Sequence, residues 1–355
     1  MVKANIGEWS ELYSLAYLLV HGGTYAADID QRPDRNTFHK VLQVHFPNSA
    51  GKKLNYIIEG DSVSILESGV AITNVTRSKI EQHLIDMFNE LTDGTRSGTF
   101  ELPAGLALAR LLCKNTISAG SGELTNDIEL ILEDPDTGSP TPRVGFNIKS
   151  QVGGRATLLN ASGSTNFIYR VESTVPGKKP EIPVFQHGKH RSNLQALYAN
   201  GYHLSFHGMS SDAFESNLTL LDMSFPEYLG KVLLNSYLLG IDNFSDAVDS
   251  VFPIDELSSR QPIFKLKEFL GAVAMGLRPS KIWDGDTTKF SGILIVKSDG
   301  ECLFYYLKNR KIFEEYLFSN VGFERPSTTR HSYGSIYEVG DEMFIKLNVQ
   351  IRFMS

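Results

Sequence analysis

The chain has 355 residues, a formal net charge of -7, and 41% hydrophobic and 21% charged residues. These fractions are those of an ordinary globular protein, and they exclude a disordered or fibrous chain. No apolar stretch approaches the roughly 18 residues that span a bilayer. Cys113 and Cys302 are isolated, which excludes a disulfide framework and fits a reducing cytoplasm. Glu8 and Glu11 stand where a signal peptide would be apolar, so we expect no export and a cytoplasmic protein.

Charge is segregated along the chain. Residues 143–210 carry a net charge of +6, whereas residues 212–277 carry -6. The negative total therefore does not exclude a protein that binds nucleic acid through one basic region. The alternative interpretation is a solvated surface that happens to be basic.

The hydrophobic pattern predicts helices and strands in alternation. In chain order we expect a helix at 6–20 ending at Gly22, strands at 41–46 and 56–66, helices at 78–91 (capped by Ser78) and 104–114, strands at 126–132 and 145–150, helices at 192–200, 225–239 and 262–275, and strands at 292–296 and 343–353. This mixture predicts an α/β (mixed α+β) fold with a central mixed sheet flanked by helices. We expect one part over residues 1–210 and a second over 211–355, or a single domain.

Two of the predicted strands carry polar residues that share one face. Turn-forming residues fill 133–142, so the strands on either side are expected to pair. Because side chains two apart in a strand point the same way, Asp127 and Glu129 share a face, as do Asn147 and Lys149. Carboxylates opposite an amide and an ammonium suit a divalent cation and a phosphate better than a core.

Magnesium prefers hard oxygen ligands and needs one or two carboxylates together with substrate phosphate oxygens. Asp127 is the expected ligand, and the backbone carbonyl of Ile148 is a candidate for another. Lys149 would lie beside the attacking water as a charge stabiliser or as a base. A metal that lowers the pKa of bound water and neutralises a phosphate supports phosphodiester hydrolysis.

Asn147 is an amide at the position where a second carboxylate would ordinarily stand. The missing acid then has three candidate sources, which are Glu129 on the first strand and Glu8 and Glu11 on the N-terminal helix. Glu8 and Glu11 are three residues apart and share a helix face. The alternative for both is that acids in the first turn stabilise the helix dipole.

Several stretches together resemble a known family. Asp127, the pair Asn147 and Lys149, and a glutamate of the N-terminal helix resemble the PD-(D/E)XK nuclease fold in a variant whose central acid has migrated. More narrowly, the chain is similar to the HpaII family of type II restriction endonucleases over nearly its whole length. The stretches that carry this similarity are residues 7–13, 145–151, 157–162, 165–167 and 347–353.

The resemblance implies a magnesium-dependent endonuclease that cuts double-stranded DNA at a short specific site, with CCGG as the default target, leaving 5′-phosphate and 3′-hydroxyl ends. It implies catalytic roles for Asp127 and Lys149, with Glu11 as the first choice for the second acid, and an orienting role for Gln151. It also implies a restriction-endonuclease core in residues 1–210 and a DNA-recognition lobe in 211–355. A homodimer or transient dimer on DNA and a cognate methyltransferase are expected. The rival interpretation is a DNA-binding protein that has lost catalysis, and nicking or RNA processing is a third.

DNA contacts are expected from polar residues after the catalytic strand and at later turns. Reading bases requires Arg, Lys, Asn or Gln on a presented loop or helix, whereas helix starts suit phosphate contacts. Arg325–His331 is expected to be a polar loop that can reach a groove. The candidate DNA-binding residues are Arg155, Asn160, Ser162, Asn166, Lys189, Arg191 and Arg330.

Overall fold

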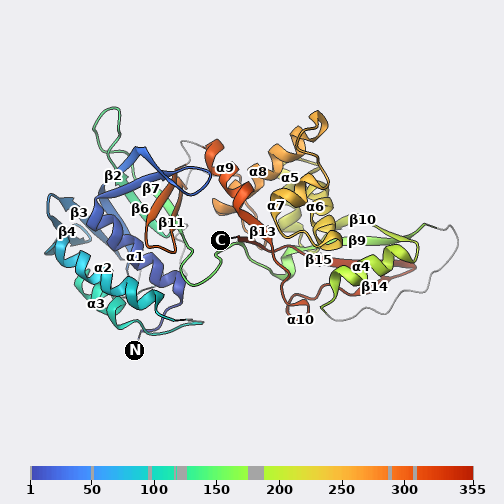
Figure 1. Ribbon diagram of the computed structural model, residues 1–355, viewed down its shortest axis with the longest axis horizontal. Helices are drawn as coiled ribbons and strands as arrows, with labels where there is room; N and C mark the ends of the chain where they lie inside the picture. The colour runs from blue at the N-terminus through green and yellow to red at the C-terminus, as the bar shows by residue number, and fades with distance from the viewer. Residues whose placement is uncertain are drawn as a thin grey trace. The chain divides into compact units, whose positions relative to one another are not determined.

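A computed structural model (Figure 1) describes residues 2–48, 52–94, 98–115, 117, 126–174, 188–286, 290–306 and 310–354. Contacts divide the chain into a first unit, 1–156 with 287–316, and a second unit, 157–286 with 317–354. In this division residue 210 lies inside the second unit, where β9 (Asn166–Ser173) pairs with β15 (Glu342–Asn348), far along the chain. Within the described ranges, no helix combines the length and the apolar character needed to cross a membrane.

A nine-stranded mixed sheet organises the first unit (Figure 1). Its order is β1-β12-β11-β7-β6-β2-β3-β4-β5, and β1 also pairs with β2. The pairs β1–β12 and β11–β7 are parallel, whereas β6–β7 and β2–β6 are antiparallel. The strands are β1 (Gly23–Ala27), β2 (Pro33–Pro47), β3 (Lys53–Glu59), β4 (Ser62–Glu67), β5 (Val70–Thr76), β6 (Ile128–Leu132), β7 (Val144–Ser150), β11 (Gly292–Val296) and β12 (Cys302–Tyr306).

Helix α1 (Ile6–His21) packs on one face of this sheet together with α2 (Arg77–Thr92) and α3 (Pro103–Leu111). Trp9 and Leu12 of α1 are fully buried in the same core as Phe146 and Ile148 of β7. The helix ends as expected at Gly22, which adopts the left-handed conformation. Helix α9 (Arg310–Asn320) follows β12 and crosses into the second unit.

The second unit contains two sheets and most of the remaining helices (Figure 1). The sheets have the orders β10-β9-β15-β14 and β13-β16-β8. Tyr169 and Tyr237 are buried and donate hydrogen bonds to the carbonyls of Gly230 and Asn348, which ties α6 to both β9 and the end of β15. The elements not yet given are β8 (Thr157–Leu159), β10 (Tyr202–Met209), β13 (Val321–Phe323), β14 (Ile336–Val339), β16 (Ile351–Phe353), α4 (His190–Ala199), α5 (Asp212–Leu221), α6 (Phe225–Leu239), α7 (Phe244–Asp249), α8 (Arg260–Ala274) and α10 (Thr328–His331).

The mixed fold expected from the sequence is confirmed, and helix 225–239 and strand 292–296 have the expected bounds. The expected strand 56–66 is two strands, β3 and β4, because Gly60 and Asp61 form a turn between them. The expected strand 343–353 is also divided. β15 pairs with β9 in one sheet, whereas β16 pairs with β13 and β8 in another.

Two local expectations were wrong. Ser78 does not cap α2, since the cap position is Thr76 and Ser78 lies inside the helix, where its hydroxyl donates to the Thr76 hydroxyl. The segment Arg325–His331 is not entirely a loop. Its second half forms the short helix α10, because the Ser327 hydroxyl accepts the N–H of Arg330 and so provides an N-terminal cap.

A substitution at Gly292, the first residue of β11, tests how closely β11 and β12 approach each other in the central sheet. Gly292 has a φ of 154°, and a Cβ there would lie 1.9 Å from the carbonyl oxygen of Tyr305 on β12. Gly292→Ala should therefore lower the free energy of unfolding by at least about 3 kcal/mol. Gly163→Ala is the matched control, since nothing lies within 4 Å of its Cβ position, and it should change stability by less than about 0.5 kcal/mol. Equal urea midpoints for the two variants would contradict the expected backbone clash.

Candidate functional site

The hairpin expected from the sequence is present as β6 and β7. Ile128 lies opposite Phe146, and Glu129 lies opposite Gly145. In the connecting turn, the Asp134 carboxylate accepts the N–H groups of Asp136 and Thr137 at 3.1 and 3.0 Å. This side-chain bonding stabilises the turn that brings the two polar strands together.

Asp127 lies immediately before β6 and is bonded twice to β7. Its N–H donates to the Phe146 carbonyl at 3.1 Å, and its Oδ2 accepts the N–H of Ile148 at 2.7 Å. The side chain thus continues the hydrogen bonding of the strand pair where β6 has not yet begun. A carboxylate has about four acceptor sites, so one bond of this kind orients Asp127 and leaves it able to bind a cation.

Asn147 and Lys149 are half-buried on the face of β7 opposite α1. This follows from strand alternation, because Phe146 and Ile148 point into the core that contains Trp9 and Leu12 of α1. Asp127 is bonded to the backbone between these two polar side chains. The structure therefore places Asp127, Asn147 and Lys149 in one neighbourhood, as the sequence predicted.

All three candidate second acids interact with other groups of the protein. The Glu8 carboxylate accepts the N–H of Asn5 at 2.7 Å, while the Asn5 side chain accepts the N–H of Glu8 at 3.0 Å. This is a capping box, so Glu8 stabilises the start of α1. The Glu129 carboxylate pairs with Lys53 at 2.9 Å and with Arg143 at 3.5 Å.

Glu11 is the third candidate, and it is half-buried on α1. The preceding residue, Ser10, bonds through its hydroxyl to the Ser150 hydroxyl at 2.7 Å, which joins this turn of the helix to the end of β7. Glu11 also interacts with the buried amine of Lys114, which donates to the Pro47 carbonyl at 2.6 Å. Burial lowers the pKa of Lys114 to about 8, although the Glu11 charge acts in the opposite direction.

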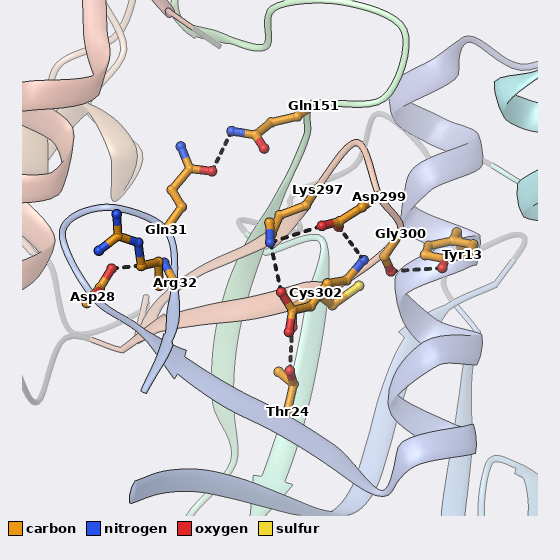
Figure 2. A network of polar contacts seen from close by, with 11 residues as sticks. Tyr13, Thr24, Asp28, Gln31, Arg32, Gln151, Lys297, Asp299, Gly300 and Cys302 are labelled. Carbon is orange, nitrogen blue, oxygen red and sulfur yellow. Dashed lines mark hydrogen bonds and ion pairs between the residues drawn. The ribbon is translucent and has the colours of Figure 1, made fainter. Parts of the chain in front are cut away.

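Gln151 contacts a loop that the sequence did not single out (Figure 2). Its Nε2 donates to Oε1 of Gln31 at 2.7 Å, and the two side chains point toward each other. The loop is held by the Asp28 carboxylate, which accepts the N–H groups of Asp30 and Arg32, both at 2.9 Å. Gln151 therefore joins the end of β7 to the connection between β1 and β2.

Figure 2 also shows a charged group on the hairpin between β11 and β12. The Lys297 amine pairs with Asp299 at 3.2 Å and with Glu301 at 2.8 Å. Desolvation by itself would lower the pKa of Lys297, but the bonds to Glu301 and Asp299 together raise it above its ordinary value. Tyr13 of α1 donates to the Gly300 carbonyl at 2.9 Å, so this hairpin is fixed to the helix that carries Glu11.

Asn126 and Gly145 form a close contact beside Asp127 that the sequence reading missed. A Cβ on Gly145 would lie 2.1 Å from Nδ2 of Asn126, so the amide rests directly on the glycine backbone. The Oδ1 atom of Asn126 is buried and has no hydrogen-bond partner within the described part of the chain. The available signal was the glycine at the start of β7, since glycine inside a strand marks a close approach.

The expected DNA-binding residues are mostly accessible. Arg155 is exposed in the first unit, and Ser162 is half-buried in the second. Within the second unit, the side chains of Asn160, Lys189, Arg191 and Arg330 are exposed. No base or phosphate contact follows from exposure alone, so these assignments remain predictions.

Asn166 does not fit its expected role in reading bases. Its side chain is 2% exposed, and its Nδ2 donates to the His331 carbonyl at 2.9 Å. Its Oδ1 accepts from Asn348 at 2.7 Å, and Asn348 also donates to the Ser162 carbonyl. An amide with both groups bonded in the interior cannot reach a base edge without breaking this network.

The residues around Asp127 suit a magnesium ion. Asp127 supplies an oriented carboxylate, and one or two carboxylates are enough when substrate phosphate and water complete the shell. The Ile148 carbonyl remains a predicted ligand. Among the described ranges, no cluster of three or more His, Cys, Asp or Glu side chains is placed to hold a metal. One oriented carboxylate would leave most of the coordination shell of a magnesium ion to water and substrate phosphate.

The sequence is similar to that of known proteins over nearly its whole length. A family model described as HpaII restriction endonuclease matches residues 5–353. The chain is 32% identical to the type II restriction enzyme HpaII of Haemophilus parainfluenzae over 362 aligned positions, which cover 99% of each chain. No solved structure matches the chain.

The low pKa of Lys114 predicts that the free energy of unfolding increases as the pH rises. Its pKa is about 8 in the folded protein against 10.5 when exposed, so between these values the unfolded chain binds more protons and stability rises with pH. The stability of the wild type relative to Lys114→Met should increase by at most about 3 kcal/mol from pH 7 to pH 10.

Urea unfolding at both pH values measures this difference. Lys79→Met is the control, because Lys79 is exposed on α2, and its stability difference from the wild type should not change with pH. A Lys114→Met difference that is also independent of pH would show that the amine is not desolvated.

Proposed function

Since the chain belongs to the HpaII restriction endonuclease family, we propose that it is a magnesium-dependent type II enzyme. It would hydrolyse phosphodiester bonds at a short specific site in double-stranded DNA and leave 5′-phosphate and 3′-hydroxyl ends. The observation that supports this best is the Asp127 carboxylate, which is bonded to the β7 backbone between Asn147 and Lys149.

We also propose that the first unit is a PD-(D/E)XK core with a migrated acid. Three features support it: the acid at the start of β6, the lysine on the neighbouring antiparallel strand β7, and the parallel pairing of β7 with β11. The N-terminal helix packs against β7, as the proposal requires.

In the proposed reaction each residue of the site has a separate task. Bound magnesium would lower the pKa of water and neutralise charge on the scissile phosphate. Asp127 holds its carboxylate in one orientation through the Ile148 N–H, so no reorganisation is needed when a cation binds. Lys149 places a positive charge on the same face, where it would stabilise the charge that develops on the phosphate; only the neutral amine could instead accept a proton from water.

Glu11 is the acid we assign to the position that Asn147 leaves open. Glu8 is engaged as a helix cap, and Glu129 is neutralised by Lys53 and Arg143. Glu11 belongs to the turn of α1 that Ser10 attaches to the end of β7. Helix α1 packs on the face of β7 opposite the one that carries Asn147 and Lys149, so the Glu11 carboxylate would have to reach the metal around the end of that strand.

We also propose a DNA target and partners, and the family supports them. CCGG is the first target to test, and a cognate methyltransferase would protect the same site. Cutting both strands of a palindrome suits two-fold symmetry, so we propose a dimer that forms at least on DNA. The basic segment 143–210 supports binding to DNA, since its net charge is +6.

Plasmid cleavage tests the catalytic assignment. Asp127→Ala and Lys149→Ala should each reduce the cleavage rate by at least about 10³-fold, since each removes a group that acts on transition-state charge. Both should still bind target DNA in calcium. The controls are Asp136→Ala in the exposed turn and Lys79→Ala on α2, which should cut at the wild-type rate.

The outcomes separate the rival functions. Full cleavage by Asp127→Ala or Lys149→Ala would show that the site is elsewhere. Specific binding by the wild type without any cleavage in magnesium would favour the alternative, a DNA-binding protein on a nuclease fold. A substrate panel that includes nicked DNA and RNA separates double-strand cleavage from nicking or RNA processing.

The second acid is tested with three matched glutamine variants. Glu11→Gln should lower the cleavage rate by at least about 10²-fold and raise the magnesium concentration needed, because it removes one ligand charge. Glu8→Gln should cost less than about 1 kcal/mol of stability and leave cleavage unchanged. Glu129→Gln should keep most activity, because its carboxylate is already paired. If Glu129→Gln is the inactive variant, the assignment moves to β6.

A further inference from the structure

The second unit has a hollow whose lining residues are one lysine and residues that carry a hydroxyl group. Helix α10, the segment after it and strands β14 and β15 surround a volume of about 390 Å³. The lining residues used below are Thr328, Thr329, Ser332, Ser335, Tyr337 and Lys346, and we call this site the hydroxyl pocket. It lies at the polar segment that the sequence predicted would reach a DNA groove.

The chemistry of the hydroxyl pocket favours an anion. Its lining supplies hydroxyl donors and one ammonium group and includes no carboxylate. Two other hollows differ in this respect. One is lined by Asp212 and Glu215 and another by Asp86 and Glu90, and such groups repel a phosphate.

Lys346 is positioned to pair with a ligand rather than with the protein. It is half-buried on β15, and its amine lies 5.4 Å from the centre of the Tyr337 ring. Within the ranges that the structure describes, no carboxylate forms an ion pair with it, whereas Arg170 of the neighbouring strand β9 pairs with Glu342 at 3.3 Å. Burial raises the pKa of Tyr337, so its phenol remains protonated and able to donate.

We propose that the hydroxyl pocket binds a phosphodiester group of the DNA backbone, with Lys346 as its ion-pairing residue. This rests on the proposed function, which makes DNA the substrate. Lysine and the hydroxyls of Ser, Thr and Tyr are among the usual donors to DNA phosphates, and such contacts position a protein without reading sequence. Arg330 of the same short helix α10 is exposed, although it is not one of the residues that line the pocket.

DNA binding by the full chain in calcium, followed by fluorescence anisotropy over a range of salt concentrations, tests the proposal. Lys346→Met removes the charge and keeps an apolar stem against Tyr337. It should weaken binding about 3- to 10-fold on a duplex with the target and on an unrelated duplex alike, and reduce the salt slope by about one. Lys346→Arg should restore both quantities.

Two further variants distinguish the pocket from a general loss of charge or fold. Lys231→Met is the control, because Lys231 on α6 is exposed and already paired with Glu227 at 2.7 Å, so its salt slope should match the wild type. Tyr337→Phe removes one lining hydroxyl without changing charge. Tyr337→Phe should weaken binding to both duplexes and leave the salt slope unchanged. If Lys346→Met does not fold, Tyr337→Phe tests the pocket in its place.

The results separate this proposal from the function on which it rests. If Lys346→Met binds DNA with the affinity and salt slope of the wild type, the pocket assignment is overturned, although cleavage by the wild type would still stand. If Lys346→Met does not fold, unchanged affinity of Tyr337→Phe would overturn it in the same way. A loss confined to the target duplex would also overturn it, since Lys346 would then read bases. If the wild type binds neither duplex, the proposed function fails and the pocket assignment fails with it.

Discussion

The hydrogen bond from the Ile148 N–H to the Asp127 carboxylate is the constraint on which the site depends. This bond is 2.7 Å long and precedes the first residue of β6, so the Asp127 side chain accepts the N–H that a backbone carbonyl of a paired strand would otherwise accept. Rotating the carboxylate away would leave a strand N–H without its acceptor, which is costly in a protein interior. β7 is itself held between β6 and β11 and packed on α1. The orientation of one carboxylate is thus fixed by the central part of the sheet.

The hairpin could be predicted because its determinants are local. Turn residues at 133–142 and alternation of polar and apolar residues on either side specify two paired strands, and the structure shows them. The division of the chain could not be predicted in the same way. It depends on pairings between distant segments, such as β7 with β11 and β9 with β15. No local pattern encodes which strands meet, so a boundary at residue 210 appeared reasonable from composition alone.

The same distinction applies to the acids of the site. The sequence contained a signal for Glu8, since Asn5 three residues earlier completes a capping box. It contained no comparable signal for Glu129, whose partner Lys53 is 76 residues away along the chain. Asn166 shows the limit for recognition residues, because its burial results from Asn348 and His331, which lie far along the sequence.

Asn147 changes the charge balance of the site rather than its geometry. A carboxylate at this position would lie beside Asp127 on the adjacent strand, and two such charges repel unless a cation is present. The amide avoids that repulsion, and the hairpin then offers Asp127 and Lys149 together with a Glu129 that is already neutralised. The proposed magnesium ion would then have one unpaired carboxylate of the hairpin, and a second negative charge from another element would strengthen its binding. α1 is attached to the end of β7 through Ser10 and Ser150, so Glu11 would have to bring this charge around that end of the strand, because α1 covers the opposite face of the sheet.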